Sequence, residues 1–154
     1  MKNKIAQAMI AGLIATAIMT GVGMMAPYMG LPKMNPALML AGMMGLPVMA
    51  GYLMHFMIGI IFAAVYVYLF NPNVQISSKF LKGLLFGLVV YVFAILMVVI
   101  MGMIMQMPEM GDKMLMMIGA LIGHLVFGIV VALIVTNYAV IKSERSIKTT
   151  DLLK

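Results

Sequence analysis

The sequence predicts an all-α fold, an integral membrane four-helix bundle made of two repeated helical hairpins, with a short interfacial helix in the first outer loop. Hydrophobic residues make up 65% of the 154 residues and charged residues only 9%, whereas a soluble domain is about half apolar and a quarter charged. The apolar residues form four long runs, and roughly 20 residues of helix cross a bilayer. The two halves of the chain also resemble each other, which predicts the two hairpins.

The first span is predicted over residues 5–25, where no charged residue interrupts the apolar run. A loop with four prolines follows over residues 26–47. Within this loop, Asn35 is a suitable N-cap and Pro36 suits the first position of a helix. The segment "NPALMLAGMM" is therefore expected to form the short helix at the membrane interface, because it is too short to span.

The second span is predicted over residues 48–70, and Asn71 and Pro72 are expected to end it because proline disrupts a helix. The third span is predicted over residues 80–105. The fourth is predicted over residues 113–141 and begins after Asp112, a plausible N-cap. Residues 1–141 would thus form a single transmembrane domain and residues 142–154 a polar cytoplasmic tail. Tyr66 and Tyr68 are expected to anchor the second span at the interface.

The basic residues predict the topology of these spans. They flank the apolar runs, so the net charge of +6 indicates membrane orientation and no nucleic-acid partner. Only Lys33 and Lys113 fall on the side of the first and third connections. The other eight fall on the opposite side, which predicts that the N-terminus and the C-terminus are both cytoplasmic.

The repeat is clearest around the two histidines. "HFMIGIIFA" from His55 aligns with "HLVFGIVVA" from His124, and "KIAQAMIAGL" from Lys4 aligns with "KFLKGLLFGL" from Lys79, which pairs Gly12 with Gly87. Two hairpins inserted in the same sense make the second and fourth spans parallel. In a simple up-down-up-down bundle these spans are diagonal, so His55 and His124 are expected to face each other at similar depth.

The histidine pair is the candidate ligand site. Residues four apart share a helix face, so His55 lies above Gly59 and His124 above Gly128, and each small-residue groove would admit another helix or a flat cofactor. A buried imidazole needs a polar partner in lipid, and those available within the spans include Thr16, Thr20, Tyr52 and Tyr91. The candidate cofactor-binding residues are His55, His124, Gly59 and Gly128.

Three interpretations of the pair remain open. The first is a b-type haem with the two histidines as axial ligands. The second is a soft cation, Cu(I) or Ag(I), bound by imidazole and thioether groups. The third is a packing role, in which the histidines hydrogen-bond across the bundle and the methionines fill gaps.

The methionines favour the copper interpretation over the haem interpretation. Apart from Met1 and Met9, all lie within residues 19–57 or 97–117, in the outer half of the bundle and its outer connections. Three of them are spaced four residues apart on the third span, which predicts a thioether ladder. The candidate metal ligands are His55, His124, Met54, Met97, Met101 and Met105.

No enzyme activity is expected, because the predicted spans contain neither Asp nor Glu and the histidines have no orienting carboxylate. The expected function is a small non-enzymatic membrane protein with a histidine-pair site. The alternative is a structural or accessory subunit that binds no cofactor. Such a subunit would pack through its small-residue faces within a larger membrane complex or a homo-oligomer. The rest of its surface would contact the lipid bilayer.

The segments "AGLIATAIMTGVGMMAPYMGLPKMNPALML", "GYLMHFMIGIIFA" and "GHLVFGIVVAL" resemble an uncharacterised bacterial family of small four-span membrane proteins, known only as a domain of unknown function. The two histidine-containing segments are the most specific part of the likeness. The resemblance implies a four-helix architecture in a bacterial inner membrane, and it implies no activity.

Overall fold

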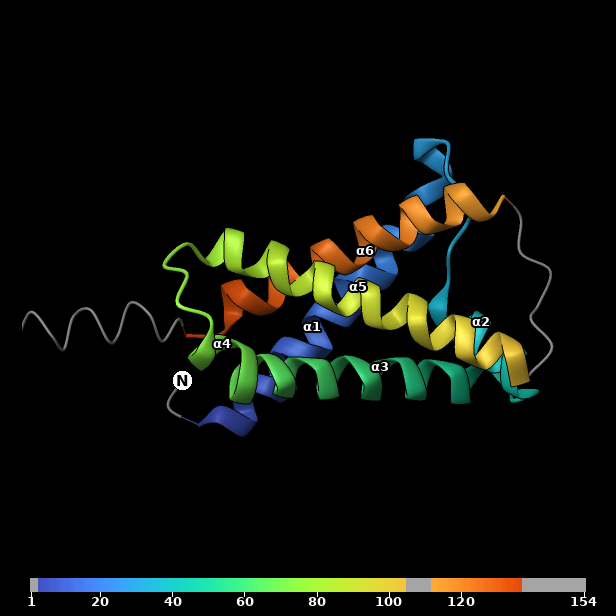
Figure 1. Ribbon diagram of the computed structural model, residues 1–154. Coiled ribbons are helices and arrows are strands. Elements are labelled where there is room, and N and C mark those ends of the chain that lie inside the picture. Colours follow the sequence, from blue (N-terminus) through green and yellow to red (C-terminus); the bar gives the residue numbers. More distant parts are fainter. Residues whose placement is uncertain (1–2, 105–111, 137–154) are drawn as a thin grey trace, which may run out of the picture.

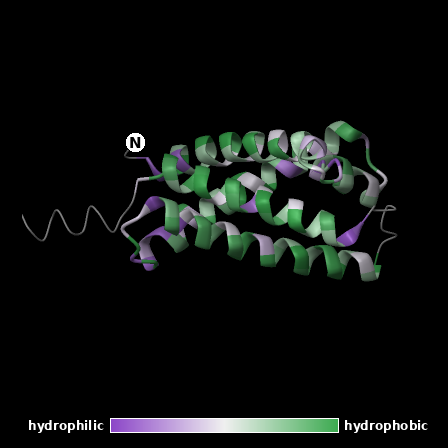
Figure 2. Cartoon of the chain, turned by 90° about the horizontal axis from the view of Figure 1, so that it is seen from above, coloured by the Kyte–Doolittle hydropathy of each residue, from purple (hydrophilic) through white to green (hydrophobic). Residues whose placement is uncertain are grey.

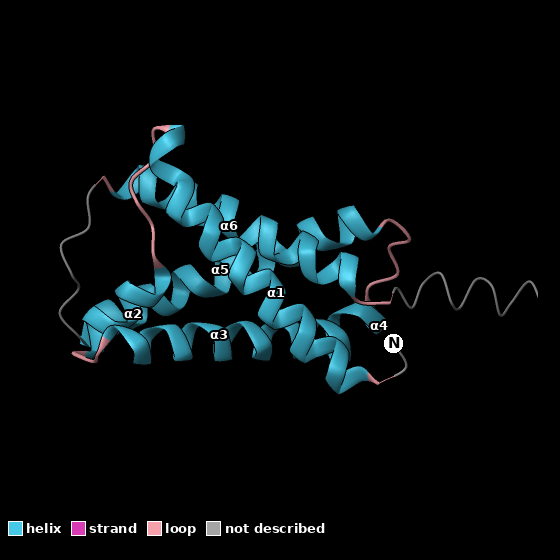
Figure 3. Ribbon diagram, turned by 180° about the vertical axis from the view of Figure 1, so that it is seen from behind, coloured by secondary structure: helices cyan, strands magenta, loops and turns pink. Residues whose placement is uncertain are grey.

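The computed structural model describes residues 3–104 and 112–136. Its four long segments are α1 (Lys4–Met25), α3 (Val48–Val65), α5 (Lys79–Ile104) and α6 (Lys113–Ile134). Each belongs to a stretch long and apolar enough to cross a membrane. No strand occurs in the described ranges, as Figure 3 illustrates. The predicted all-α class is therefore confirmed, together with four helices that are long and apolar enough to span a membrane.

The four spans surround a common core (Figure 1). Seen from the side, α3 and α6 run roughly parallel, while α1 behind and α5 in front cross between them in opposite senses; the view from behind agrees. α1 packs against both α3 and α6, and α5 packs most extensively against α6. The spans that carry His55 and His124 are thus diagonal to one another.

Polar residues gather mainly at the end of the bundle that holds the N-terminus, whereas apolar residues dominate the long helices (Figure 2). We call this the inner end, after the predicted topology. It contains Asn3, which caps α1, and α4 (Asn71–Asn73). The outer end contains α2 (Pro36–Met44) and the start of α6.

Two predicted caps are confirmed. The Asn35 side chain accepts hydrogen bonds from the backbone N–H groups of Ala37 and Leu38, with Pro36 in the first turn of α2. Asp112 accepts from the N–H groups of Met114 and Leu115 at the start of α6. Such side chains satisfy donors that a helix leaves unpaired, which fixes where each helix begins.

The short helix α2 packs against α3. Ala37 and Ala41 of α2 are buried, and a side chain at Gly51 of α3 would collide with both of them. The Asn35 amide also donates to the Tyr52 hydroxyl at 2.7 Å. Before α2, a short 3-10 helix, η1 (Ala26–Met29), follows α1 directly.

The prediction that Asn71 and Pro72 end the second span is wrong. A π-helical turn, η2 (Tyr66–Phe70), follows α3 and leads directly into α4. In a regular α-helix a proline ring clashes with the carbonyl four residues earlier. The wider π turn, closed by the Asn71 N–H on the Tyr66 carbonyl, gives Pro72 room to continue the helix.

Two further expectations are corrected. Tyr66 is not an interfacial anchor, because it is fully buried and packs against Phe70 and Phe86, with ring centroids 5.7 and 4.9 Å away. The helix of the fourth span ends at Ile134 rather than at 141, since Val135 is extended. Residues 137–141 of that prediction lie outside the described ranges, as does the polar tail 142–154.

Candidate functional site

His55 lies on the buried face of α3, in line with Gly51, Gly59 and Ala63. Its side chain is 8% exposed, and its Nε2 atom is buried without a hydrogen-bond partner. An unsatisfied polar atom inside a protein is costly and unusual. A pure packing role would require a hydrogen bond from His55 across the bundle. The Nε2 atom of His55 does not make such a bond.

His124 lies on the face of α6 that also carries the buried residues Phe127, Gly128 and Val131. Its Nδ1 is 2.7 Å from the carbonyl oxygen of Ala120. A carbonyl only accepts, so Nδ1 carries the proton, and in the neutral ring Nε2 keeps a lone pair. Metal-ligating histidines have this arrangement, in which a second group fixes one nitrogen and frees the other.

His55 and His124 lie within α3 and α6, the two helices that are diagonal to one another in the bundle. The Tyr91 ring from α5 lies edge-on to His124, with centroids 5.9 Å apart. Phe56 is edge-on to His55 at 6.3 Å. Each histidine is therefore in contact with one aromatic ring.

Gly59 and Gly128 are packed against helices rather than left open. A side chain at Gly59 would run into the Thr16 hydroxyl of α1, and one at Gly128 would meet the backbones of Gly83 and Gly87 of α5. The small-residue grooves are thus filled by neighbouring helices. They do not provide the space beside the histidines that the planar macrocycle of a haem would need.

Thr16 is a second unsatisfied group beside this site. It is fully buried, and its Oγ1 has no hydrogen-bond partner. It touches Gly59, one helical turn from His55 on α3. Thr20, one turn further along α1, donates to the Thr16 carbonyl at 2.8 Å. Two unpartnered polar atoms, on adjacent turns of one interface, mark this part of the interior as unusually polar.

The predicted methionine ligands are less closely tied to the pair. Met54, Met97 and Met101 are half-buried. Met105 lies outside the described ranges. The outer half of α5, from Tyr91 onward, has no fully buried residue. Within the described residues, no three histidine, aspartate or glutamate side chains gather into a metal-binding group.

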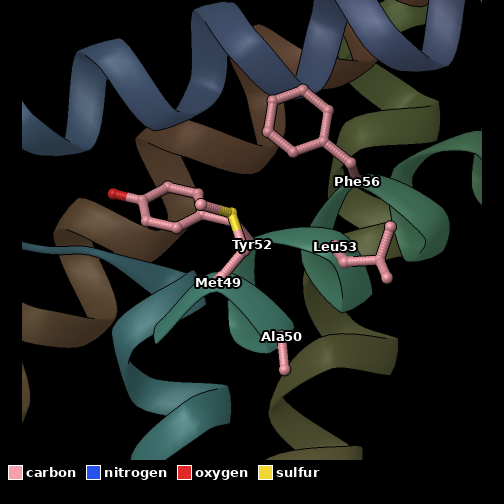
Figure 4. Close-up of a pocket in the computed structure, with 5 residues that line it drawn as sticks. All are labelled: Met49, Ala50, Tyr52, Leu53 and Phe56. Carbon is pink, nitrogen blue, oxygen red and sulfur yellow. The ribbon is translucent and has the colours of Figure 1, made fainter. Parts of the chain in front are cut away.

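A hollow of about 370 Å³ opens beside α3 in its outer half (Figure 4). Its lining is apolar and comes from one helix: Met49, Ala50, Tyr52, Leu53 and Phe56. Neither histidine lines it. The hollow therefore does not supply the space for a haem held by both rings.

Sequence reasoning missed a polar cluster at the inner end. Lys82 is fully buried, and its ammonium donates to the backbone carbonyl and the side-chain Oδ1 of Asn71, each at 2.8 Å. The Asn71 amide donates to the Thr136 carbonyl at 2.7 Å, and the Thr136 N–H donates to Gln7 at 3.1 Å. All four spans are joined by these bonds.

The clue to this cluster was the helical position of Lys82. It shares one face of α5 with the buried residues Phe86 and Val90, spaced four residues apart. Lys79 instead is half-buried and donates a solvent-exposed hydrogen bond to the Leu133 carbonyl. A lysine on the apolar face of a span is costly, so it must find acceptors inside the protein.

No curated protein and no solved structure matches this chain. A family profile described as "Family of unknown function (DUF6789)" matches residues 2–146, nearly the whole sequence. The predicted resemblance to a family of unknown function is confirmed, and the chain belongs to the DUF6789 family.

Proposed function

We propose that this chain is a small, non-enzymatic, multi-pass protein of the bacterial inner membrane that binds a soft monovalent cation between His55 and His124. Cu(I) and Ag(I) are the ions of this class. The observation that carries the proposal is the buried Nε2 of His55, which has no protein partner and lies on the helix diagonal to the one that carries His124. The Nδ1–H of that second ring is held by Ala120, which leaves its Nε2 for a ligand.

The ligand types favour Cu(I) over harder ions. Imidazole suits copper and zinc alike, whereas thioethers select Cu(I). Methionines surround the outer half of the bundle, and no aspartate or glutamate lies in the described spans. A carboxylate-free interior is a poorer site for a divalent ion than for a monovalent one, because two positive charges rather than one stay unbalanced.

Haem is the weaker candidate, because helices fill the grooves at Gly59 and Gly128. A structural or accessory subunit remains the competing class. The close glycine contacts in both hairpins would serve such a role equally well. What this alternative leaves unexplained is the unpartnered nitrogen of His55.

The test is a Cu(I) titration of the purified full-length chain in detergent, without oxygen, against a chromophoric Cu(I) chelator. We expect one Cu(I) per chain, and loss of this binding in the His55→Ala, His124→Ala double variant. Equal binding by the double variant, or no binding by the unmodified chain, would overturn the proposal. A Soret band in protein from haem-replete cells would instead favour haem.

We further propose that the two hairpins are repeats of one unit. Gly12 approaches Ile60 and the Gly59 carbonyl of α3, as Gly83 approaches Ile129 and the Gly128 carbonyl of α6. These contacts support the repeat. They also pair Gly12 with Gly83, one helical turn from the Gly87 that the sequence alignment selects.

A further inference from the structure

Met19 is one of two buried methionines in the described part of the chain; the other is Met43 of α2. Met19 lies on α1, the helix that packs against both histidine-bearing spans. It is absent from the ligand set that the sequence suggests, because it belongs to neither the ladder on α5 nor the segment around His55.

The packing of α1 against α6 places Met19 against Gly123, the residue before His124. The Cγ and Cε atoms of Met19 each lie 3.5 Å from the position that a Cβ at Gly123 would occupy. The sulfur is bonded to both of these atoms, so the thioether lies over Gly123. Gly123 directly precedes His124 in the chain.

The packing of α1 against α3 places Met19 at the level of His55. These helices run antiparallel, with Gly12 against Ile60 and Thr16 against Gly59. One further turn outward along α1 reaches Met19 and Thr20, and one turn outward along α3 from Gly59 reaches His55. Met19 therefore lies at about the depth of residue 55 on α3 and of residue 123 on α6.

We propose that the thioether of Met19 is the third ligand of the His55–His124 site and makes the site selective for a soft monovalent cation over Zn(II). This inference rests on the proposed function and identifies the sulfur ligand that completes the proposed site. A thioether is a soft, uncharged donor, which favours Cu(I) or Ag(I) and adds little for Zn(II). Three ligands from three helices would also tie α1, α3 and α6 together at one depth.

Met54, Met97 and Met101 are the competing thioethers. All three are half-buried, and Met97 and Met101 lie on the loosely packed outer half of α5. A buried side chain has already lost most of its conformational entropy on folding, so it loses less entropy when it binds an ion. Met19 meets that condition and the half-buried methionines do not.

The test is X-ray absorption at the copper edge on the full-length chain loaded with one equivalent of Cu(I), with Cu(I) and Zn(II) affinities measured in parallel. The variant is Met19→Leu, a swap of similar volume that cores tolerate. Met43→Leu is the matched control, because Met43 is equally buried but lies on α2. If Met19→Leu does not fold, Met19→Gln keeps the unbranched shape without the sulfur.

We expect two nitrogen neighbours and one sulfur neighbour in the unmodified chain and in Met43→Leu. Met19→Leu should keep both nitrogens, lose the sulfur, and bind Cu(I) about 10- to 100-fold more weakly, the range typical of groups that tune a metal site. Its Zn(II) affinity should not change. Retention of the sulfur neighbour in Met19→Leu overturns this inference alone, whereas absence of Cu(I) binding in the unmodified chain overturns the proposed function with it.

Discussion

The ammonium of Lys82 lies 2.8 Å from Oδ1 of Asn71, and both side chains are fully buried. Lys82 also donates to the Asn71 backbone carbonyl, close to the end of the helical stretch Val48–Asn73. Lys82 of α5 thus binds the inner end of the second span. The Asn71 amide in turn donates a hydrogen bond to the Thr136 carbonyl, beyond the end of α6.

Replacing Lys82 with methionine should destabilise the protein. The change leaves two buried acceptors of Asn71 without their donor, which costs about 1–3 kcal/mol for such groups. Lys79→Met is the matched control, because Lys79 is only half-buried and its hydrogen bond to the Leu133 carbonyl is exposed to solvent, so its loss should cost about 0.5 kcal/mol. Thermal unfolding of the detergent-solubilised variants measures both effects. Equal stability of the two variants would show that the Lys82 bonds contribute nothing.

Gly128→Ala should separate α5 from α6. A methyl group at Gly128 would meet the backbones of Gly83 and Gly87, which cannot rotate away. Overpacking of this kind costs about 1–3 kcal/mol. Gly21→Ala is the control, since nothing lies within 4 Å of a Cβ at that position. The control should match or exceed the unmodified chain in stability, because alanine favours a helix by up to about 1 kcal/mol over glycine. A stable Gly128→Ala variant would contradict the close contact.

Asn35→Ala should loosen α2 from α3 more than Tyr52→Phe does. The first variant loses both the cap of α2 and the bond to the Tyr52 hydroxyl, whereas the second loses only that bond. A lost N-cap costs about 1 kcal/mol and a hydrogen bond about 0.5–1.5 kcal/mol. Hydrogen exchange of the α2 amides reports the difference. The reverse order of exchange rates would show that the cap does not hold this helix.

The predicted topology can be checked by labelling, because the chain has no cysteine of its own. Lys33→Cys lies in the first outer loop and Gln75→Cys between α4 and α5. In spheroplasts, a membrane-impermeant maleimide should label Lys33→Cys, and it should label Gln75→Cys only after the membrane is opened. The opposite pattern would invert the orientation predicted from the basic residues.

The sequence predicts the spans well because apolar length is a direct requirement of the bilayer. Predicted starts at residues 5, 48, 80 and 113 fall within one residue of the observed helices. The caps Asn35 and Asp112 were also predictable, because capping depends on local chemistry. The helix end predicted at Pro72 was wrong because the effect of a proline depends on the preceding turn, and a π turn has no clear signal in the sequence.

The site was predictable in part. The two histidines and their diagonal arrangement follow from spacing and hairpin order. The role proposed for Met19 does not, because it depends on how α1 sits between α3 and α6, and the apolar sequence of α1 gives little indication of which face is buried. Lys82 was hidden for a related reason: lysines near span ends usually reach the interface, and only the packed structure reveals that this one turns inward.

The most direct test of the central claim is nitrogen NMR of the two imidazoles during titration with Ag(I). The chain has only two histidines, so the full-length protein labelled with ¹⁵N-histidine gives an assignable spectrum. We predict that Nε2 of both His55 and His124 couples to the same silver nucleus at one Ag(I) per chain. Nδ1 of His124 should keep its proton and continue to donate it to the Ala120 carbonyl. Unchanged Nε2 resonances, or silver bound to a single ring, would contradict the account.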